Sequence, residues 1–200
     1  MDKDRILQEL VEENNGYLFT SMATKEGITK PYLARYVKKY GLERVARGIY
    51  ITDDVWPDEL YIMQARSAAV IFFGETALYL HDLIDREYTK ICVSVPVGYN
   101  ATHLKKGKAD SLQVRYAAKA LYELGVCMVS SDSGNMVRAY DKERCICDLI
   151  ADRDRIEVQD LQTALKGYMS GKDKRLSKLI GYAEKIGIRD EVMKYVEVLV

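Results

Sequence analysis

The apolar and polar positions of the first thirty residues alternate between helical and extended spacing. An apolar stripe at i, i+1, i+4 and i+5 predicts an amphipathic helix over about residues 3–14. The Asn-Asn-Gly run at 14–16 ends this helix, because glycine adopts the left-handed cap conformation at little cost. The apolar run 17–19 is short enough for a strand, and Thr20 or Ser21 can cap a second brief helix.

A third helix is predicted after the tight turn at Gly27-Ile28. Thr29 stands at its N-cap, and Pro31 falls in its first turn, where a missing N–H costs little. Gly41 ends the helix. The segment 42–51 then consists of two short apolar runs joined by an Arg-Gly pair, which predicts a hairpin.

The two sides of this third helix differ in chemistry. Leu33, Tyr36 and Val37 follow the apolar stripe and are expected to face the core. The other side is polar and mostly basic, and it carries Lys30, Tyr32, Arg35 and Lys38 or Lys39.

This order of elements (helix, strand, helix, tight turn, helix, hairpin) predicts a winged helix-turn-helix domain over residues 1–54. In such domains the third helix enters the major groove and the hairpin approaches the flanking phosphates. Arg44 and Arg47 on the hairpin are therefore expected to contact phosphate, with Gly48 allowing a close approach. Lys30, Tyr32 and Arg35 are the expected readers of base edges, with Thr29 near a phosphate.

The distribution of charge supports this interpretation, although the chain is neutral overall with 30 Lys and Arg against 30 Asp and Glu. Residues 1–26 hold three basic and six acidic side chains, a net charge of −3, whereas residues 27–50 hold six basic side chains and one Glu, a net charge of +5. A loop contributes a second basic patch. The predicted DNA-binding residues are Thr29, Lys30, Tyr32, Arg35, Lys38, Lys39, Arg44, Arg47, Lys105, Lys106 and Lys108. The alternative is that these charges only solvate the surface of a small helical domain.

Residues 55–200 predict a larger domain with a small mixed sheet and a helical C-terminus, so that the whole chain is of the α+β class. Trp56 lies in a linker and is expected to pack as an anchor between the domains. The first expected elements are a helix over about 58–70, with Asp58 as the cap, and a helix that Gly74-Glu75-Thr76 starts and that runs through 77–83. Strands are expected at 90–96, 126–130 and 136–140, and three amphipathic helices follow Asp141.

No pattern of catalytic or metal-binding residues stands out. The four cysteines, Cys92, Cys127, Cys145 and Cys147, lack the paired spacing of a zinc site and are expected to be reduced thiols packed as small apolar groups. Glu75, His81, Asp82 and Asp85 form a polar cluster, but a helix-start carboxylate and a hydrogen-bonded histidine explain it. We therefore expect no enzyme activity, no metal and no cofactor.

The chain also lacks the signals of membrane proteins and of secreted proteins. Its longest uncharged apolar run is far too short to span a bilayer, and its charged, periodic N-terminus does not resemble a secretion signal. The sequence thus predicts a cytoplasmic protein without a membrane partner.

The sequence resembles the AbiEi family, the antitoxins of the AbiE abortive-infection (phage-resistance) toxin–antitoxin systems. The resemblance covers nearly the whole chain and rests on GITKPYLARYVKKYGLERVARGIYI, GETALYLHDLIDR, VSVPVGY and VRAYDKERCICDLIADRDRI. It implies a DNA-binding N-terminal domain that represses its own operon at inverted repeats. It also implies a C-terminal domain that counters a nucleotidyltransferase toxin in the type IV mode, in which the two proteins need no stable complex.

We therefore expect an autorepressing antitoxin that binds double-stranded operator DNA, monomeric in solution and with two copies on the inverted repeats. The first alternative is a winged-helix repressor whose C-terminal domain senses a small ligand. The second is a nuclease or other enzyme built on the C-terminal domain. No strand carries the acidic–x–lysine pattern of a metal-dependent nuclease, which disfavours the second alternative.

Overall fold

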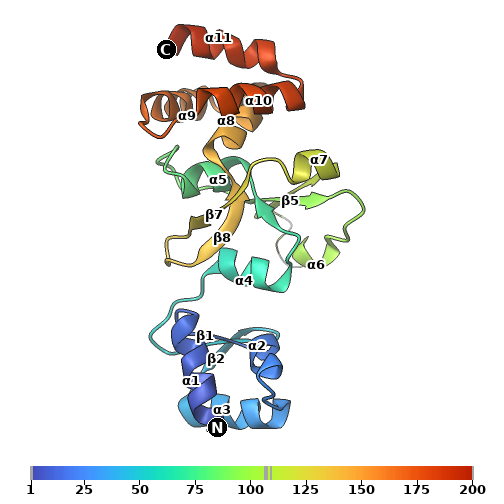
Figure 1. Cartoon of the computed structure of the whole chain (residues 1–200), viewed down its shortest axis with the longest axis vertical. Helices are drawn as coiled ribbons and strands as arrows, with labels where there is room; N and C mark the ends of the chain where they lie inside the picture. Colours follow the sequence, from blue (N-terminus) through green and yellow to red (C-terminus); the bar gives the residue numbers. More distant parts are fainter. Residues whose placement is uncertain (1, 106–107, 109, 200) are drawn as a thin grey trace. The chain divides into compact units, whose positions relative to one another are not determined.

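A computed structural model describes residues 2–105, 108 and 110–199 of the protein. Figure 1 shows the order of its elements along the chain. In the first sixty-six residues these are α1 (Lys3–Glu13), β1 (Tyr17–Phe19), α2 (Thr20–Lys25), α3 (Lys30–Tyr40), β2 (Glu43–Ala46), β3 (Ile49–Ile51) and α4 (Glu59–Arg66). After them come β4 (Ile71–Phe72), α5 (Gly74–Leu80), β5 (Ile91–Pro96), α6 (Thr102–Lys105), β6 (Leu112–Ala117), α7 (Lys119–Tyr122), β7 (Val126–Ser130), β8 (Met136–Tyr140), α8 (Lys142–Ala151), the 3-10 turn η1 (Arg153–Arg155), α9 (Val158–Ser170), α10 (Leu176–Ile186) and α11 (Arg189–Leu199).

The chain forms two compact units, Met1–Ile62 and Met63–Val200. The first unit extends past the boundary expected at Asp54, because Val55, Tyr61 and Ile62 pack against its sheet. Trp56 does not act as the expected packing anchor, since its side chain is 87% exposed.

The three helices of the first unit enclose a small apolar core. Leu7 of α1, Ala23 of α2 and Leu33 of α3 are buried in it. The other buried members of this cluster are Leu18, Ile28, Tyr36 and Leu42. The expected inward face of α3 is thus confirmed. Gly41 ends α3 in the left-handed conformation, with φ of 69°, which glycine tolerates and most other residues do not.

A three-stranded antiparallel sheet of order β1-β3-β2 completes the first unit. Tyr17, Phe19, Ile49 and Ile51 form its buried cluster. The predicted 42–51 hairpin is therefore present as β2 and β3. The register shifts between Arg44 and Ala46, which marks a local irregularity in β2.

The N-caps of α2 and α3 differ from the side-chain caps that the sequence predicted. Phe19, rather than Thr20 or Ser21, occupies the N-cap position of α2, and no side chain caps it. Thr29 does occupy the N-cap position of α3, but its side chain makes no capping hydrogen bond. Only the Thr29 carbonyl contributes there, accepting the Leu33 N–H at 2.9 Å.

The second unit contains a five-stranded mixed sheet of order β6-β5-β4-β8-β7. The pairs β5–β6 and β4–β8 are parallel, and the pairs β4–β5 and β7–β8 are antiparallel. The predicted strands 126–130 and 136–140 are confirmed, and β5 lies within the predicted strand 90–96. The sequence interpretation missed the two-residue β4 and also β6, whose apolar positions alternate with polar ones.

Helices pack on this sheet and then on one another up to the C-terminal helix. Helix α5 packs against β5 and α8, and α9, α10 and α11 pack against α8 (Figure 1). The expected helix 58–70 is shorter, ending at Arg66, and the helix expected to start at Gly74-Glu75-Thr76 ends at Leu80 rather than at Leu83. Asp58 caps α4 as expected, its carboxylate accepting the Tyr61 N–H at 3.0 Å. The protein is therefore a mixed α+β protein with two small sheets and a helical C-terminus.

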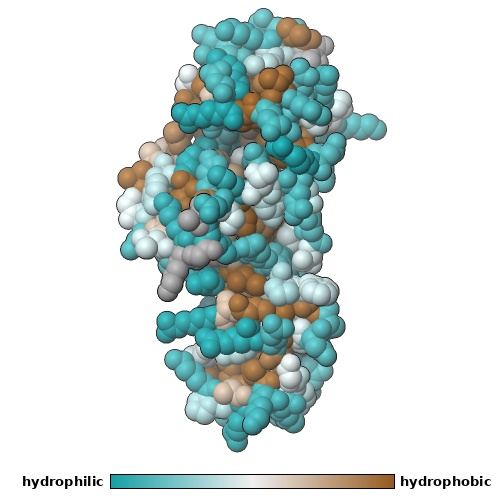
Figure 2. Space-filling model, turned by 180° about the vertical axis from the view of Figure 1, so that it is seen from behind, coloured by the Kyte–Doolittle hydropathy of each residue, from teal (hydrophilic) through white to brown (hydrophobic). Residues whose placement is uncertain are grey.

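The surface seen in Figure 2 is mainly hydrophilic, with apolar atoms in separate patches. Across residues 2–105, 108 and 110–199, no helix is long and apolar enough to cross a membrane. Cys92, Cys145 and Cys147 are buried, as expected for thiols packed as apolar groups, whereas Cys127 is only half-buried.

The turn before β1 gives a direct test of the first unit's packing. Gly16 has φ of +83°, and a Cβ there would lie 2.4 Å from Val55 Cγ2 and 2.8 Å from Thr52 Oγ1. Gly27 has a similar φ of +74° with open space around it. We expect Gly27→Ala to lower the free energy of unfolding by about 1–2 kcal/mol, the cost of the left-handed backbone. Gly16→Ala should lower the free energy of unfolding by about 1–3 kcal/mol more than Gly27→Ala does, because its methyl group would also overpack against Val55 and Thr52.

Urea unfolding followed by circular dichroism measures both variants in the full chain. Equal losses for Gly16→Ala and Gly27→Ala would contradict the close packing of Gly16 against Val55.

Candidate nucleic-acid interface

The outer face of α3 presents basic side chains without carboxylate partners. Lys30, Arg35 and Lys38 are exposed, and none of them forms an ion pair with another described residue. Arg35 and Lys38 stand three positions apart and so share one face of the helix. The Thr29 hydroxyl lies exposed at the start of the same helix. This face can donate several hydrogen bonds to an anion.

A second face of α3 is occupied by Asp4 of α1. One oxygen of the Asp4 carboxylate accepts the Tyr32 hydroxyl at 2.8 Å. The other accepts the Lys39 ammonium at 2.7 Å and the Tyr40 hydroxyl at 3.1 Å. The hydrogen bonds from Lys39 and then Tyr32 lower the pKa of the Asp4 carboxyl. This contact, here called the Asp4 clasp, joins α1 to both ends of α3.

The Asp4 clasp corrects the sequence interpretation at two positions. Tyr32 and Lys39 were expected on the outward side with Arg35, but both turn toward Asp4 instead. The Tyr32 ring is also partly buried against the core and lies 5.2 Å from the Arg35 guanidinium. The spacing of seven between Tyr32 and Lys39 places them on one side of the helix, but this spacing does not identify their common partner on α1.

The hairpin carries two more exposed cations. Arg44 lies on β2, where its Nε donates to the Ala46 carbonyl at 3.3 Å, and Arg47 lies in the turn. Gly48 has φ of +77°, and its carbonyl accepts the Thr20 N–H at 2.8 Å. This bond ties the hairpin turn to the start of α2, so the Arg47 backbone is held in place.

The second basic patch belongs to the second unit and differs from its prediction. Lys105 is exposed at the end of α6, and Lys106 lies outside the described residues. Lys108 is partly buried, and this burial lowers the pKa of its ammonium group. Lys108 is therefore not the fully solvated side chain that the sequence suggested.

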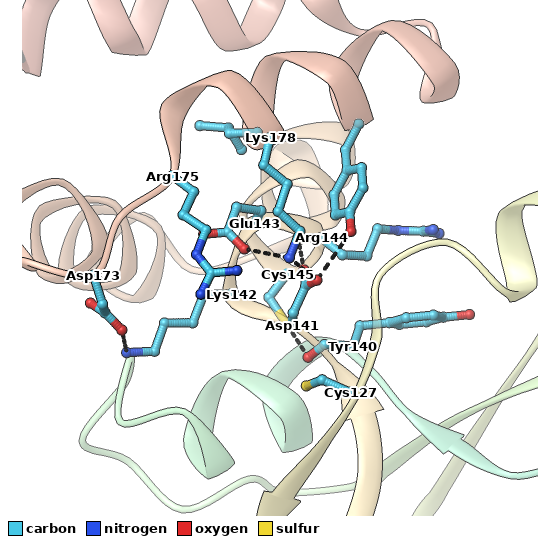
Figure 3. Close-up of polar contacts among 12 residues, drawn as sticks. Cys127, Tyr140, Asp141, Lys142, Glu143, Arg144, Cys145, Asp173, Arg175 and Lys178 are labelled. Atoms are coloured by element: carbon cyan, nitrogen blue, oxygen red, sulfur yellow. Dashed lines mark hydrogen bonds and ion pairs between the residues drawn. The ribbon is translucent and has the colours of Figure 1, made fainter.

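The sequence interpretation did not identify the polar cluster that joins α8 to α10 (Figure 3). Lys178 lies 2.8 Å from Asp141 and 3.4 Å from Glu143, and the Tyr182 hydroxyl donates to Asp141 at 3.2 Å. Burial alone would lower the pKa of Lys178. The hydrogen bond to Asp141 and the negative charge of Asp141 outweigh burial, so the pKa of Lys178 is raised. The run of charges at the start of an otherwise apolar helix was the available signal. The cluster holds α10 on α8.

A buried ionic contact lies further along α8. Asp148 accepts from Arg144 at 2.9 Å on one oxygen and from Arg115 at 2.7 Å on the other. The Arg115 guanidinium also lies 4.0 Å from the centre of the Phe73 ring. Breaking such a buried contact on one side leaves an unpaired charge in the interior, so its role is structural.

The polar cluster around α5 is built as the sequence predicted. Glu75 lies in the first turn of α5, and His81 follows the last turn. The His81 Nε2 atom lies 2.8 Å from the Tyr140 carbonyl and 3.8 Å from the Cys127 sulfur. No group of three or more potential ligands among the described residues could hold a metal ion.

A cavity of about 320 Å³ lies in the second unit, between α5, β5, α8 and the start of α9. Its walls combine apolar side chains with four carboxylates. Asp148 and Asp160 have arginine partners, whereas Glu75 and Asp152 form no ion pair with a described residue. The volume is at the lower end of the range for sites that bind small molecules, about 300–1,000 Å³.

These features define the class of protein as a mixed α+β chain with a basic helix–hairpin unit and a larger sheet–helix unit. No family model and no curated protein matches the sequence. Among solved structures, the chain is similar to the crystal structure of the RV2827C protein from Mycobacterium tuberculosis. The TM-score is 0.52 with 15% sequence identity, and the match covers 90% of this chain and 70% of that chain. At this identity the likeness concerns the fold alone.

The environment of His81 predicts a pH dependence of stability. Burial lowers the pKa of His81, although the hydrogen bond with the Tyr140 carbonyl and the charges of Asp141 and Glu143 oppose this, and Lys142 adds to it. Because the folded-state pKa lies below the unfolded value of about 6.5, the unfolded state binds more protons as the pH falls. The free energy of unfolding should therefore fall below pH 6.5, by up to about 1.4 kcal/mol per pH unit.

Urea unfolding between pH 7 and pH 5 tests this. His81→Asn should remove most of the slope, and His103→Gln, which changes the exposed second histidine, should leave it intact. An unchanged slope in His81→Asn would contradict the account.

Proposed function

We propose that the first unit is a winged helix-turn-helix DNA-binding domain and that the protein represses its own operon as an antitoxin. In this proposal α2 and α3 form the helix-turn-helix and the β2–β3 hairpin forms the wing. The target is double-stranded operator DNA with inverted repeats, bound by two copies. The second unit counters a nucleotidyltransferase toxin without a stable complex.

One observation carries the DNA-binding part of the proposal. Five exposed cations without carboxylate partners among the described residues gather on α3 and the hairpin. They are Lys30, Arg35, Lys38, Arg44 and Arg47. Helix α3 itself carries no acidic residue, and the hairpin carries one, Glu43. Unpaired basic groups attract phosphate, and release of counterions from DNA then favours binding.

The Asp4 clasp reduces the number of α3 residues that we assign to DNA contacts. Lys30 and Arg35 are in the half of α3 that enters the groove in this type of domain, so we assign them to base edges. Lys38, Arg44 and Arg47 are assigned to phosphates, with the Thr29 hydroxyl as a further donor. Tyr32 and Lys39 position α3 through Asp4. A carboxylate on that side would repel phosphate, so DNA approaches the other face.

The antitoxin part of the proposal rests on the resemblance of the sequence to the AbiEi family. The segment VRAYDKERCICDLIADRDRI, one of those that carry the resemblance, includes β8 from its second residue onward and the whole of α8. Helix α8 is the element against which α9, α10 and α11 pack. We therefore propose that the antitoxic surface is formed by the second unit alone.

The experiment measures repression and growth rescue together. The protein is expressed with the product of the neighbouring gene, which this proposal expects to be a nucleotidyltransferase, and a reporter is placed behind their own promoter. We expect the wild type to repress the reporter and restore growth. The double variant Arg44→Ala, Arg47→Ala should lose repression and keep rescue under an independent promoter. Its binding to promoter DNA should show a log–log salt slope smaller by about two units, about one for each phosphate contact.

The matched control is Lys3→Ala, Arg5→Ala, which removes two exposed cations from α1 of the same unit. This variant should repress like the wild type. An unchanged salt slope in the hairpin variant would contradict the wing assignment, and failure of the wild type to restore growth would contradict the antitoxin assignment.

The cavity beside α5 favours a second candidate, a repressor whose second unit binds a small ligand. Its volume of about 320 Å³ suits a small molecule. Its lining includes Arg155 as well as Glu75 and Asp152, two carboxylates that form no ion pair with a described residue and could accept hydrogen bonds from such a molecule. Both candidates share the DNA-binding step. Repression without growth rescue is the outcome that favours the ligand-binding repressor.

A further inference from the structure

Strand β7 ends the five-stranded sheet of the second unit and has one open edge (Figure 1). It pairs with β8 over all five residues, from Val126 opposite Tyr140 to Ser130 opposite Met136, without a bulge. Apart from this ladder with β8, no backbone hydrogen bond among the described residues joins Val126–Ser130 to another segment. Every second residue of β7 therefore points its N–H and C=O groups away from the sheet.

This edge lacks the usual protection against pairing with another chain. Proteins shield edge strands with charges, prolines or bulges, or cover them with other segments. The β7 sequence, Val-Cys-Met-Val-Ser, contains no charged residue and no proline. Three large apolar side chains are exposed beside the edge: Val126 at 36%, Met128 at 53% and Met136 at 51%.

We infer that β7 is a self-association surface, where it pairs antiparallel with β7 of a second copy of this chain. A two-fold axis at Met128, the middle residue, sets Val126 opposite Ser130 of the other copy and the two Met128 side chains side by side. Met136, on the neighbouring strand beside Ser130, adds apolar surface to the same face. The pairing joins the two sheets into one and uses both open β7 edges, so association stops at two copies.

A second copy suits this edge because the strand is complementary to itself. An uncharged strand brings no like charges opposite each other in an antiparallel pair, and such pairs of like charges are destabilising. On the shared face the exposed side chains of β7 are apolar or hydroxyl, so each copy offers what the other can cover. Arg138 of β8, opposite Met128, is partly exposed on this face, and its guanidinium donates to the Val70 carbonyl at 3.1 Å.

The contact must be weak, since five paired residues and three apolar side chains bury much less than the roughly 1,200–2,000 Å² of a stable interface. The protein is then monomeric when dilute, and it pairs when concentrated. Two copies held on one DNA fragment have a high effective concentration for each other. This last consequence rests on the proposed function, whereas self-association itself does not.

Analytical ultracentrifugation from about 10 µM to 1 mM tests the pairing. The wild type should rise from the monomer mass toward twice that mass. Met128→Lys should stay monomeric, because it places two like charges side by side at the axis. The matched control, Val97→Lys, adds the same charge at a 69% exposed apolar position outside β7, and it should behave like the wild type. Ser130→Lys is a second edge variant, in case Met128→Lys fails to fold.

A wild type that stays monomeric at 1 mM overturns the inference. So does self-association of folded Met128→Lys or Ser130→Lys equal to that of the wild type, or a wild type that grows beyond two copies.

The cooperativity of DNA binding is a second, separate measurement of the pairing. On a promoter fragment with two half-sites, the wild type should bind with a Hill coefficient near 2 and Met128→Lys with one near 1, while both bind a single half-site equally. Equal cooperativity in the two proteins contradicts pairing through β7. Absence of any DNA binding by the wild type contradicts the proposed function and leaves the ultracentrifugation result to decide the pairing.

Discussion

The contact between Asp4 of α1 and three side chains of α3 decides how the first unit can be used. One carboxylate accepts hydrogen bonds from Tyr32, Lys39 and Tyr40, so two helices far apart in the sequence are joined at both ends of α3. The core alone would fix which side of α3 is buried. The Asp4 clasp divides the remaining surface into a side that faces α1 and a side that carries unpaired cations.

Much of the first unit could be predicted from local signals. Periodicity, Gly41 at a helix end, and the Arg-Gly turn each depend on neighbouring residues, and the helices and hairpin appear where they were expected. The positions of Tyr32 and Lys39 could not be predicted in the same way, because Asp4 lies 28 and 35 residues away from them. A helical pattern identifies the buried face but does not say which exposed residues meet another helix.

In the second unit, long-range contacts set more of the structure, and less of it was predictable. The two-residue β4 is too short to show a pattern, yet it links β5 to β8 at the centre of the sheet. Apolar and polar residues alternate along β6 in the sequence, but this strand was not among those predicted. The ion pairs of Asp148 show the same limit. Arg144 lies four residues before Asp148 on α8, a spacing that is visible in the sequence, whereas Arg115 comes from β6 and could not be predicted as a partner.

Two adjacent lysines of α3 test the account most directly. Lys38 is exposed on the outer face and forms no ion pair with a described residue, whereas Lys39 is bound to Asp4. Operator binding of Lys38→Ala and Lys39→Ala is measured over a range of salt concentrations. We predict that Lys38→Ala lowers the log–log salt slope by about one unit, the loss of one phosphate contact, and that Lys39→Ala leaves the slope unchanged. A lower slope in Lys39→Ala with an unchanged slope in Lys38→Ala would contradict the account.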